Sequence, residues 1–236
     1  MRRHSVLKIV IVLLLLLPGC KKVKEVVQEV SLNYIALGDS YTIGESVAES
    51  QRYPVLLVEG LRDEGYIIND PVIIARTGWT TDELAAGIEA ANIAGTYDLV
   101  SLLIGVNNQY RGRDLSNYRD EFRALLQQAV DFAGGRSENV FVLSIPDWGV
   151  TPFAASRDRE RIANEIDQYN AVNREETQKR GILYVDVTPI SRKAIEDPSL
   201  IAEDGLHPSG KMYAAWVDLA LPGVVEILNT QIKPAK

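Results

Sequence analysis

The strongest constraint on the fold is an alternation between short, almost wholly apolar segments and amphipathic segments with helical spacing. The apolar segments have the length of strands buried on both faces, and the segments between them have the 3.6-residue period of helices that cover a sheet. The predicted strands are residues 34–38, 72–75, 98–104, 139–145 and 182–186. Buried strands separated by helices pair in parallel, so the sequence predicts an α/β fold.

The helices expected between and after these strands cover residues 50–64, 80–93, 118–133, 162–172 and 209–228. Ser50 is expected to cap the first helix. Thr80 and Glu83 have the spacing of a capping box, in which each side chain bonds the backbone of the other residue, and they begin the second helix. Pro222 is expected to break or kink the last helix, because proline has no N–H to donate.

The N-terminus has the features of an export signal. A basic start is followed by an apolar run over residues 7–17 and then by Leu17-Pro18-Gly19-Cys20. The run is too short to span a bilayer comfortably, and Cys20 resembles the lipidated cysteine of a bacterial lipobox. We therefore expect a signal peptide over residues 1–19, a lipidated tether over 20–31 and one folded domain over 32–236. A plain signal peptide or an uncleaved anchor is the alternative.

This interpretation predicts an exported bacterial lipoprotein anchored to a membrane by a lipid on Cys20, facing the periplasm or the cell surface. With one cysteine in the chain, an intramolecular disulfide is impossible. Cleavage would remove three of the 25 basic residues and none of the 32 acidic ones, leaving a formal charge of about −10. Such a surface repels phosphate backbones, so nucleic acid is not an expected partner.

Histidine is scarce in this chain, which limits the possible chemistry. The sequence contains only His4 and His207, and His4 lies in the predicted signal peptide. A histidine-rich metal site is excluded, and we expect no metal or cofactor. Any histidine-dependent step must use His207. Asp204, three residues earlier, could accept the Nδ1–H of His207 and leave Nε2 free to act as a base, although a lone loop histidine often only bonds its own loop.

Groups suited to acyl transfer follow three of the predicted strands. Ser40 ends the Gly38-Asp39-Ser40 turn, Gly78 follows the second strand, and Asn107 follows the third. Each is an ordinary turn residue by itself. The carboxyl ends of parallel strands meet at one sheet edge, however, where a hydroxyl, a backbone N–H and a carboxamide would form a nucleophile with an oxyanion hole.

A substrate pocket at this edge would need apolar walls. Trp148, in the loop after the fourth strand, could form such a wall or could simply pin its loop to the domain. Trp79 and Asn108 are further candidates for contact with a substrate.

Taken together, these motifs resemble those of the SGNH (GDSL) hydrolase family. The matching blocks, in the family's order, are Gly38-Asp39-Ser40, Gly78, Gly105-x-Asn107 and Asp204-x-x-His207. The family's third block usually ends in aspartate, where this chain has Asn108. The resemblance implies a flavodoxin-like three-layer sandwich whose five-stranded parallel sheet has the order 2-1-3-4-5.

The resemblance also implies a serine esterase with a Ser-His-Asp triad. Ser40 would be the nucleophile, His207 the base and Asp204 its orienting carboxylate. The oxyanion would be held by the N–H groups of Ser40 and Gly78 and by the Asn107 side chain. The expected substrates are acyl or acetyl esters of a small molecule, lipid or glycan. An acyltransferase, or a non-catalytic envelope lipoprotein that binds a glycan or lipid in the same pocket, remains an alternative.

Overall fold

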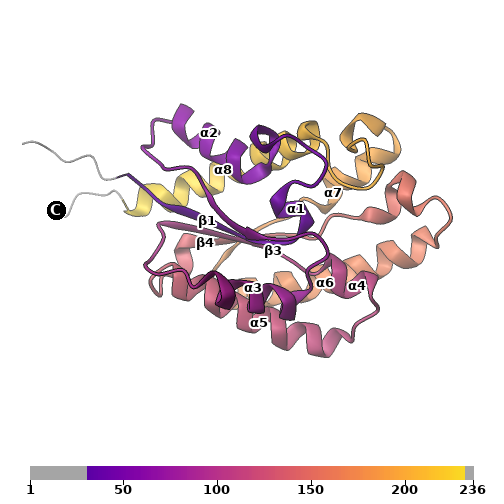
Figure 1. The fold of residues 1–236 in the computed structure, drawn as a ribbon, viewed down its shortest axis with the longest axis horizontal. Helices are drawn as coiled ribbons and strands as arrows, with labels where there is room; N and C mark the ends of the chain where they lie inside the picture. Colours follow the sequence, from indigo (N-terminus) through magenta and orange to yellow (C-terminus); the bar gives the residue numbers. More distant parts are fainter. Residues whose placement is uncertain (1–30, 232–236) are drawn as a thin grey trace, which may run out of the picture.

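A computed structural model of the chain describes residues 31–231 and contains a five-stranded, entirely parallel sheet (Figure 1). The strands are β1 (Tyr34–Gly38), β2 (Val72–Ala75), β3 (Leu99–Leu103), β4 (Val140–Leu143) and β5 (Leu183–Val185). Their order across the sheet is β2-β1-β3-β4-β5. The predicted α/β class and the order 2-1-3-4-5 are both confirmed.

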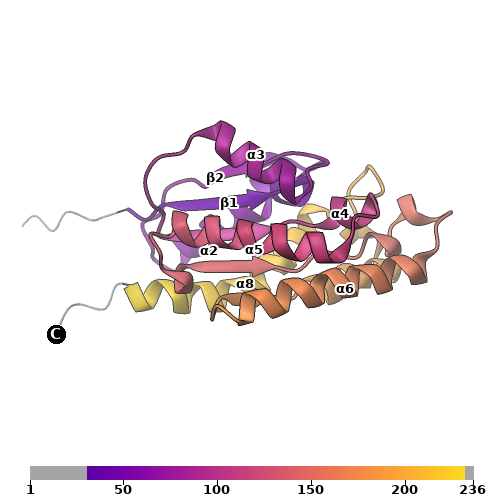
Figure 2. The same cartoon turned by 90° about the horizontal axis from the view of Figure 1, so that it is seen from below.

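Helices cover both faces of the sheet and make it the middle of three layers (Figures 1 and 2). One face carries α1 (Ser40–Ile43), α2 (Tyr53–Asp63), α7 (Thr188–Arg192) and α8 (Gly210–Gln231). The other carries α3 (Thr81–Ala91), α5 (Leu115–Phe132) and α6 (Arg159–Gln178), with α4 (Val106–Tyr110) beyond the end of β3. Short 3₁₀ turns are η1 (Glu49–Gln51), η2 (Ser137–Asn139), η3 (Trp148–Val150), η4 (Pro152–Ala154), η5 (Lys193–Ile195) and η6 (Pro198–Leu200).

Two helix predictions differ from the structure. Ser50 does not cap α2, because it lies inside η1, and the extended residue Arg52 occupies the N-cap position instead. Pro222 lies within α8, which continues through it to Gln231, so the predicted break does not occur and a kink there stays a prediction. Pro222 and Asp218, whose carbonyl loses its usual N–H partner, are both exposed. Water can therefore satisfy that carbonyl, and the helix continues.

The buried side chains fix α2 and α8 against the sheet. Tyr34 of β1 and Tyr53 of α2 both bond the buried hydroxyl of Ser101 on β3, at 2.7 and 3.1 Å. Trp216 of α8 is fully buried, with its ring centroid 6.4 Å from that of Tyr53 and 5.1 Å from that of Tyr213. The loop before α8 is therefore held at a defined place over the sheet.

Strand register brings three strand ends together. Gly38, the last residue of β1, lies opposite Ala75 of β2 and Leu103 of β3. A Cβ at position 38 would collide with the Leu103 carbonyl and the Thr42 hydroxyl, so the close approach requires glycine. The loops that follow β1, β2 and β3 therefore begin side by side.

The predicted signal peptide and the lipidation site at Cys20 lie outside the described residues. Within residues 31–231, every helix is too short or too polar to cross a membrane. The same part of the chain contains no group of three or more potential ligand side chains suited to a metal ion.

Candidate active site

Ser40 lies at the turn between β1 and α1. Asp39 caps α1, and its Oδ1 accepts the N–H of Tyr41 at 3.0 Å. The Ser40 carbonyl accepts the N–H groups of Gly44 and Glu45, which closes the single turn of α1. The Ser40 side chain is thereby held at the carboxyl edge of the sheet, where the residue is only 4% exposed.

Asp39 is fully buried beneath this turn. Burial raises the pKa of its carboxyl to about 7, against the opposing effect of the N–H of Tyr41 and its own backbone N–H. Its second oxygen, Oδ2, has no hydrogen-bond partner among the described residues. Asp39 therefore shapes the loop from the interior and does not face the pocket.

Asp204 and His207 form a hydrogen-bonded pair on the loop before α8. Nδ1 of His207 lies 2.5 Å from Oδ2 of Asp204, while Oδ1 accepts the N–H groups of Leu206 and His207 at 2.9 and 3.0 Å. Burial raises the pKa of Asp204, but hydrogen bonds from the His207 ring and N–H, from Ser46 and from Leu206 outweigh it and bring the pKa well below its usual range. The carboxylate is therefore ionised and fixes the ring's orientation.

Ser40 and His207 line the same pocket, whose volume is about 200 Å³. Its other lining residues are Tyr41, Thr77, Gly78, Val106, Asn107, Tyr110, Trp148, Phe153 and Leu206. The Tyr41 ring meets the His207 ring edge-on, with centroids 5.7 Å apart. A mostly apolar cavity with a few polar groups is the usual form of a small-molecule site.

Gly78 and Asn107 reach this pocket from the ends of β2 and β3. Gly78 has φ +86°, a backbone conformation that residues with a Cβ atom rarely adopt. Its carbonyl accepts a hydrogen bond from Arg111 Nη2 at 2.6 Å. Asn107 Nδ2 donates to the Trp79 carbonyl at 2.9 Å. That bond uses one of the two amide hydrogens of Nδ2, so the group can still donate a second hydrogen bond.

A buried hydrogen bond fixes Trp148, the central residue of the pocket's aromatic wall. Trp148 is 5% exposed, and its Nε1 donates to Gln109 Oε1 at 2.8 Å. Its ring centroid lies 5.4 Å from that of Tyr110 and 5.9 Å from that of Phe153. Tyr110 and Phe153 are 49% and 44% exposed, so they form the outer rim.

The other two predicted substrate contacts lie outside the pocket lining. Asn108 is fully buried; its Oδ1 accepts the Thr81 N–H at 3.1 Å, and its Nδ2 donates to Thr81 Oγ1 at 2.6 Å. Asn108 thus joins α4 to the start of α3. The ring of Trp79 packs against Gly87 of α3, leaving only its backbone carbonyl to bond Asn107.

Sequence reasoning missed several lining residues that are neighbours of motif residues. Thr77 precedes Gly78, Leu206 precedes His207, and Val106 lies between the motif residues Gly105 and Asn107. Their positions next to motif residues could have indicated from the sequence that these three residues line the pocket. Ser46, which bonds Asp204 at 2.7 Å, carries no such signal.

The fold and the site together define an α/β protein with a serine just after its first strand and, lining the same pocket, a histidine bonded to an aspartate. A model of the GDSL-like lipase/acylhydrolase family matches residues 36–215, and the chain belongs to that family.

Among individual proteins, an acetylxylan esterase from Geobacillus stearothermophilus is 27% identical over 142 residues, which cover 56% of this chain and 62% of that esterase. The chain thus matches somewhat less than two thirds of that relative's length. The crystal structure of TesA superposes with a TM-score of 0.64 at 19% identity, covering 83% of this chain and 99% of TesA. A crystal structure of acetylxylan esterase from G. stearothermophilus superposes with a TM-score of 0.60 at 20% identity, covering 84% of this chain and 94% of that esterase. At these identities the superpositions show a shared fold.

Proposed function

We propose that the protein is a serine carboxylic-ester hydrolase that acts on acyl or acetyl esters of a lipid or glycan through an acyl-serine intermediate. The observation that carries this proposal is that Ser40 and the Asp204-bonded His207 line one apolar pocket. Membership of a family of acylhydrolases supports it.

In the proposed mechanism, Asp204 holds the Nδ1 side of the His207 ring, so Nε2 takes the proton of Ser40 Oγ as that oxygen attacks the ester carbonyl. His207 then protonates the departing alcohol. Water, activated by His207 in the same way, hydrolyses the acyl-serine and releases the acid.

The tetrahedral intermediate carries a negatively charged oxygen that hydrogen-bond donors must stabilise. We assign this role to the N–H groups of Ser40 and Gly78 and to the remaining amide hydrogen of Asn107. The bonds from Arg111 to the Gly78 carbonyl and from Asn107 to the Trp79 carbonyl would keep these donors in place before substrate arrives. Losing one oxyanion donor typically costs about 10²–10³ in turnover.

We infer a short acyl group from the size of the pocket. Its volume of about 200 Å³ is below the roughly 300–1,000 Å³ of sites that enclose drug-sized ligands. The exposed Tyr110 and Phe153 rings offer flat apolar surfaces next to the pocket, which suit the face of a sugar ring in the alcohol portion. The similarity to an acetylxylan esterase supports an acetylated glycan as the first substrate to try.

Export and lipidation at Cys20 form part of the proposal and rest on the N-terminal sequence. Such an anchor would place the esterase at the membrane, facing the periplasm or the cell surface. Acyl transfer to an acceptor other than water uses the same intermediate and is the second candidate. Binding without catalysis is less favoured, because a binder has no need of Ser40, Asp204 and His207 together.

Hydrolysis of p-nitrophenyl acetate by the purified protein, with Ser40→Ala beside it, tests the proposal. We expect the variant to lose at least about 10³ in kcat/KM, because the nucleophile is removed. Ser50→Ala, at an exposed serine in η1, is the matched control and should keep full activity. Equal rates for wild type and Ser40→Ala would refute catalysis at this site. A panel from acetyl to palmitoyl esters, with acetylated xylan and lysophospholipid, then identifies the substrate.

A further inference from the structure

The Asp204 carboxylate receives a hydrogen bond from a distant part of the chain. Three of its donors, the Leu206 N–H and the N–H and Nδ1 of His207, belong to its own loop. The fourth is the hydroxyl of Ser46, which donates to Oδ2 at 2.7 Å from 158 residues away in the sequence. Oδ2 is also the oxygen that faces His207 Nδ1, so Ser46 and the ring share one acceptor atom.

Ser46 adopts a backbone conformation that is costly for its residue type. Its φ is +64°, and Asn92 is the one other non-glycine residue with positive φ among residues 31–231. A left-handed serine costs on the order of 1 kcal/mol. Asn92 ends a helix, where this conformation is common. At Ser46 the conformation accompanies the hydroxyl's bond to the carboxylate.

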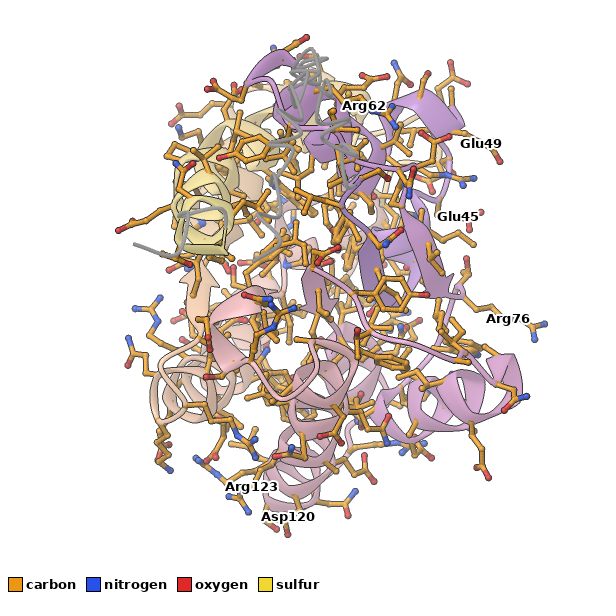
Figure 3. All side chains as sticks on the ribbon, turned by 90° about the vertical axis from the view of Figure 1, so that its left-hand side faces the viewer. Glu45, Glu49, Arg62, Arg76, Asp120 and Arg123 are labelled. Atoms are coloured by element: carbon orange, nitrogen blue, oxygen red, sulfur yellow. The ribbon has the colours of Figure 1, made fainter. Side chains whose placement is uncertain are left out.

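The turn that contains Ser46 is tied to Ser40 as well. The Ser40 carbonyl accepts the N–H groups of Gly44 and Glu45. The Glu45 side chain accepts the hydroxyl of Thr77, the pocket residue before Gly78. Figure 3 shows Glu45 on the same side of the molecule as Arg76, which precedes Thr77. Residues 44–46 therefore join the loops that carry Ser40, Gly78 and the Asp204–His207 pair.

We propose that Ser46 is a positioning residue, whose hydroxyl holds the Asp204 carboxylate and so fixes the His207 ring relative to Ser40. This inference rests on the proposed esterase function. Within that function it assigns Ser46 to the acid–base system, although Ser46 lies outside the pocket and touches no substrate. Loss of even a weak hydrogen bond to a charged group, where it is felt in the transition state, corresponds to about a tenfold lower kcat.

Two substitutions separate the hydroxyl from the backbone strain. Both Ser46→Ala and Ser46→Gly remove the hydroxyl, but only glycine tolerates φ +64° without cost. We expect both variants to lose about tenfold in kcat with KM little changed. We also expect the acid limb of the pH–rate profile to move to higher pH, because Oδ2 then interacts with His207 alone. A Ser46→Gly variant with wild-type kcat, or an acid limb that does not move in either variant, would overturn the proposal.

A double-mutant cycle tests whether Ser46 acts through Asp204. In an Asp204→Ala background, Ser46→Gly should change kcat by less than twofold, because the carboxylate it positions is absent. A further tenfold loss in that background would assign Ser46 a different role. Ser50→Ala again serves as the control for a serine-to-alanine change in the same segment.

A measurement without substrate keeps this test separate from the proposed activity. The Nδ1–H of a histidine bonded to a carboxylate gives a downfield proton resonance, which Asp204→Asn would assign by its loss. We expect this proton to exchange with water faster in Ser46→Gly than in wild type. An unchanged exchange rate would refute the positioning role even if the protein hydrolysed no ester. Failure of the esterase proposal would instead appear as equal rates for wild type and Ser40→Ala.

Discussion

The buried carboxyl of Asp39 predicts a large pH dependence of stability that one substitution should remove. Its pKa is about 7 in the folded protein against 3.8 for an exposed aspartate. The folded state therefore holds this proton more tightly than the unfolded chain does. The resulting stabilisation is fully present below about pH 4 and is lost as the pH rises through about 7. A difference of about three pKa units corresponds to about 4 kcal/mol, of which about 3 kcal/mol falls between pH 5 and pH 8.5.

Asp39→Asn replaces the titrating group with a neutral one of the same shape. The amide oxygen can still accept the Tyr41 N–H that Oδ1 accepts now. We therefore expect the free energy of unfolding of the variant, relative to that of the wild type, to rise by about 3 kcal/mol between pH 5 and pH 8.5. Contributions from all other titrating groups are common to both proteins and cancel in this difference.

Urea unfolding curves at half-unit pH steps, followed by circular dichroism, measure this difference directly. Asp114→Asn is the control, because Asp114 is an exposed helix cap whose pKa is lowered by bonds from Ser116 and Asn117. Its free-energy difference from wild type should not change between pH 5 and pH 8.5. If the Asp39→Asn and wild-type curves of free energy against pH ran parallel over this range, Asp39 would be ionised in the folded protein and the reasoning from its burial would be wrong.

Two further substitutions test buried charge elsewhere. The Glu176 side chain is 4% exposed, and hydrogen bonds, the largest from Arg123, lower its pKa to about 2 against the opposing effect of burial. The stabilisation that ionised Glu176 gives the folded protein is present above about pH 4.5 and is lost as the pH falls through about 2. We therefore expect Glu176→Gln to lower the free energy of unfolding, measured with urea, by about 1–3 kcal/mol at pH 7 and by much less near pH 2. Asn108→Asp introduces the residue that is usual in the family. We expect it to lower the free energy of unfolding by about 1–3 kcal/mol at pH 7, because Thr81 Oγ1 would lose its amide donor and a charge would be buried. An unfolding midpoint equal to that of wild type would contradict the prediction for either variant.

The architecture could be predicted because each strand is an almost wholly apolar run and each long helix has an amphipathic period. Ser40 and His207 could be placed in one pocket because few residues were eligible: one usable histidine, and a hydroxyl directly after a strand. Trp79 and Asn108 could not be assigned from position alone. The backbone turns sharply at Gly78, and the direction of the next side chains depends on contacts with α3 that no local pattern contains. The Ser46–Asp204 bond joins residues 158 positions apart, so only the tertiary structure shows it.

The described chain begins and ends at the amino edge of the sheet, whereas α1 and α4 lie at the opposite, carboxyl edge (Figure 1). This arrangement has a practical use in protein engineering. A fusion partner, an affinity tag or a solid support joined at either end of residues 31–231 would lie on the far side of the domain from Ser40. The protein is therefore suited to immobilisation in a flow reactor or to display on a particle, with its pocket turned toward the passing solution whichever end is attached.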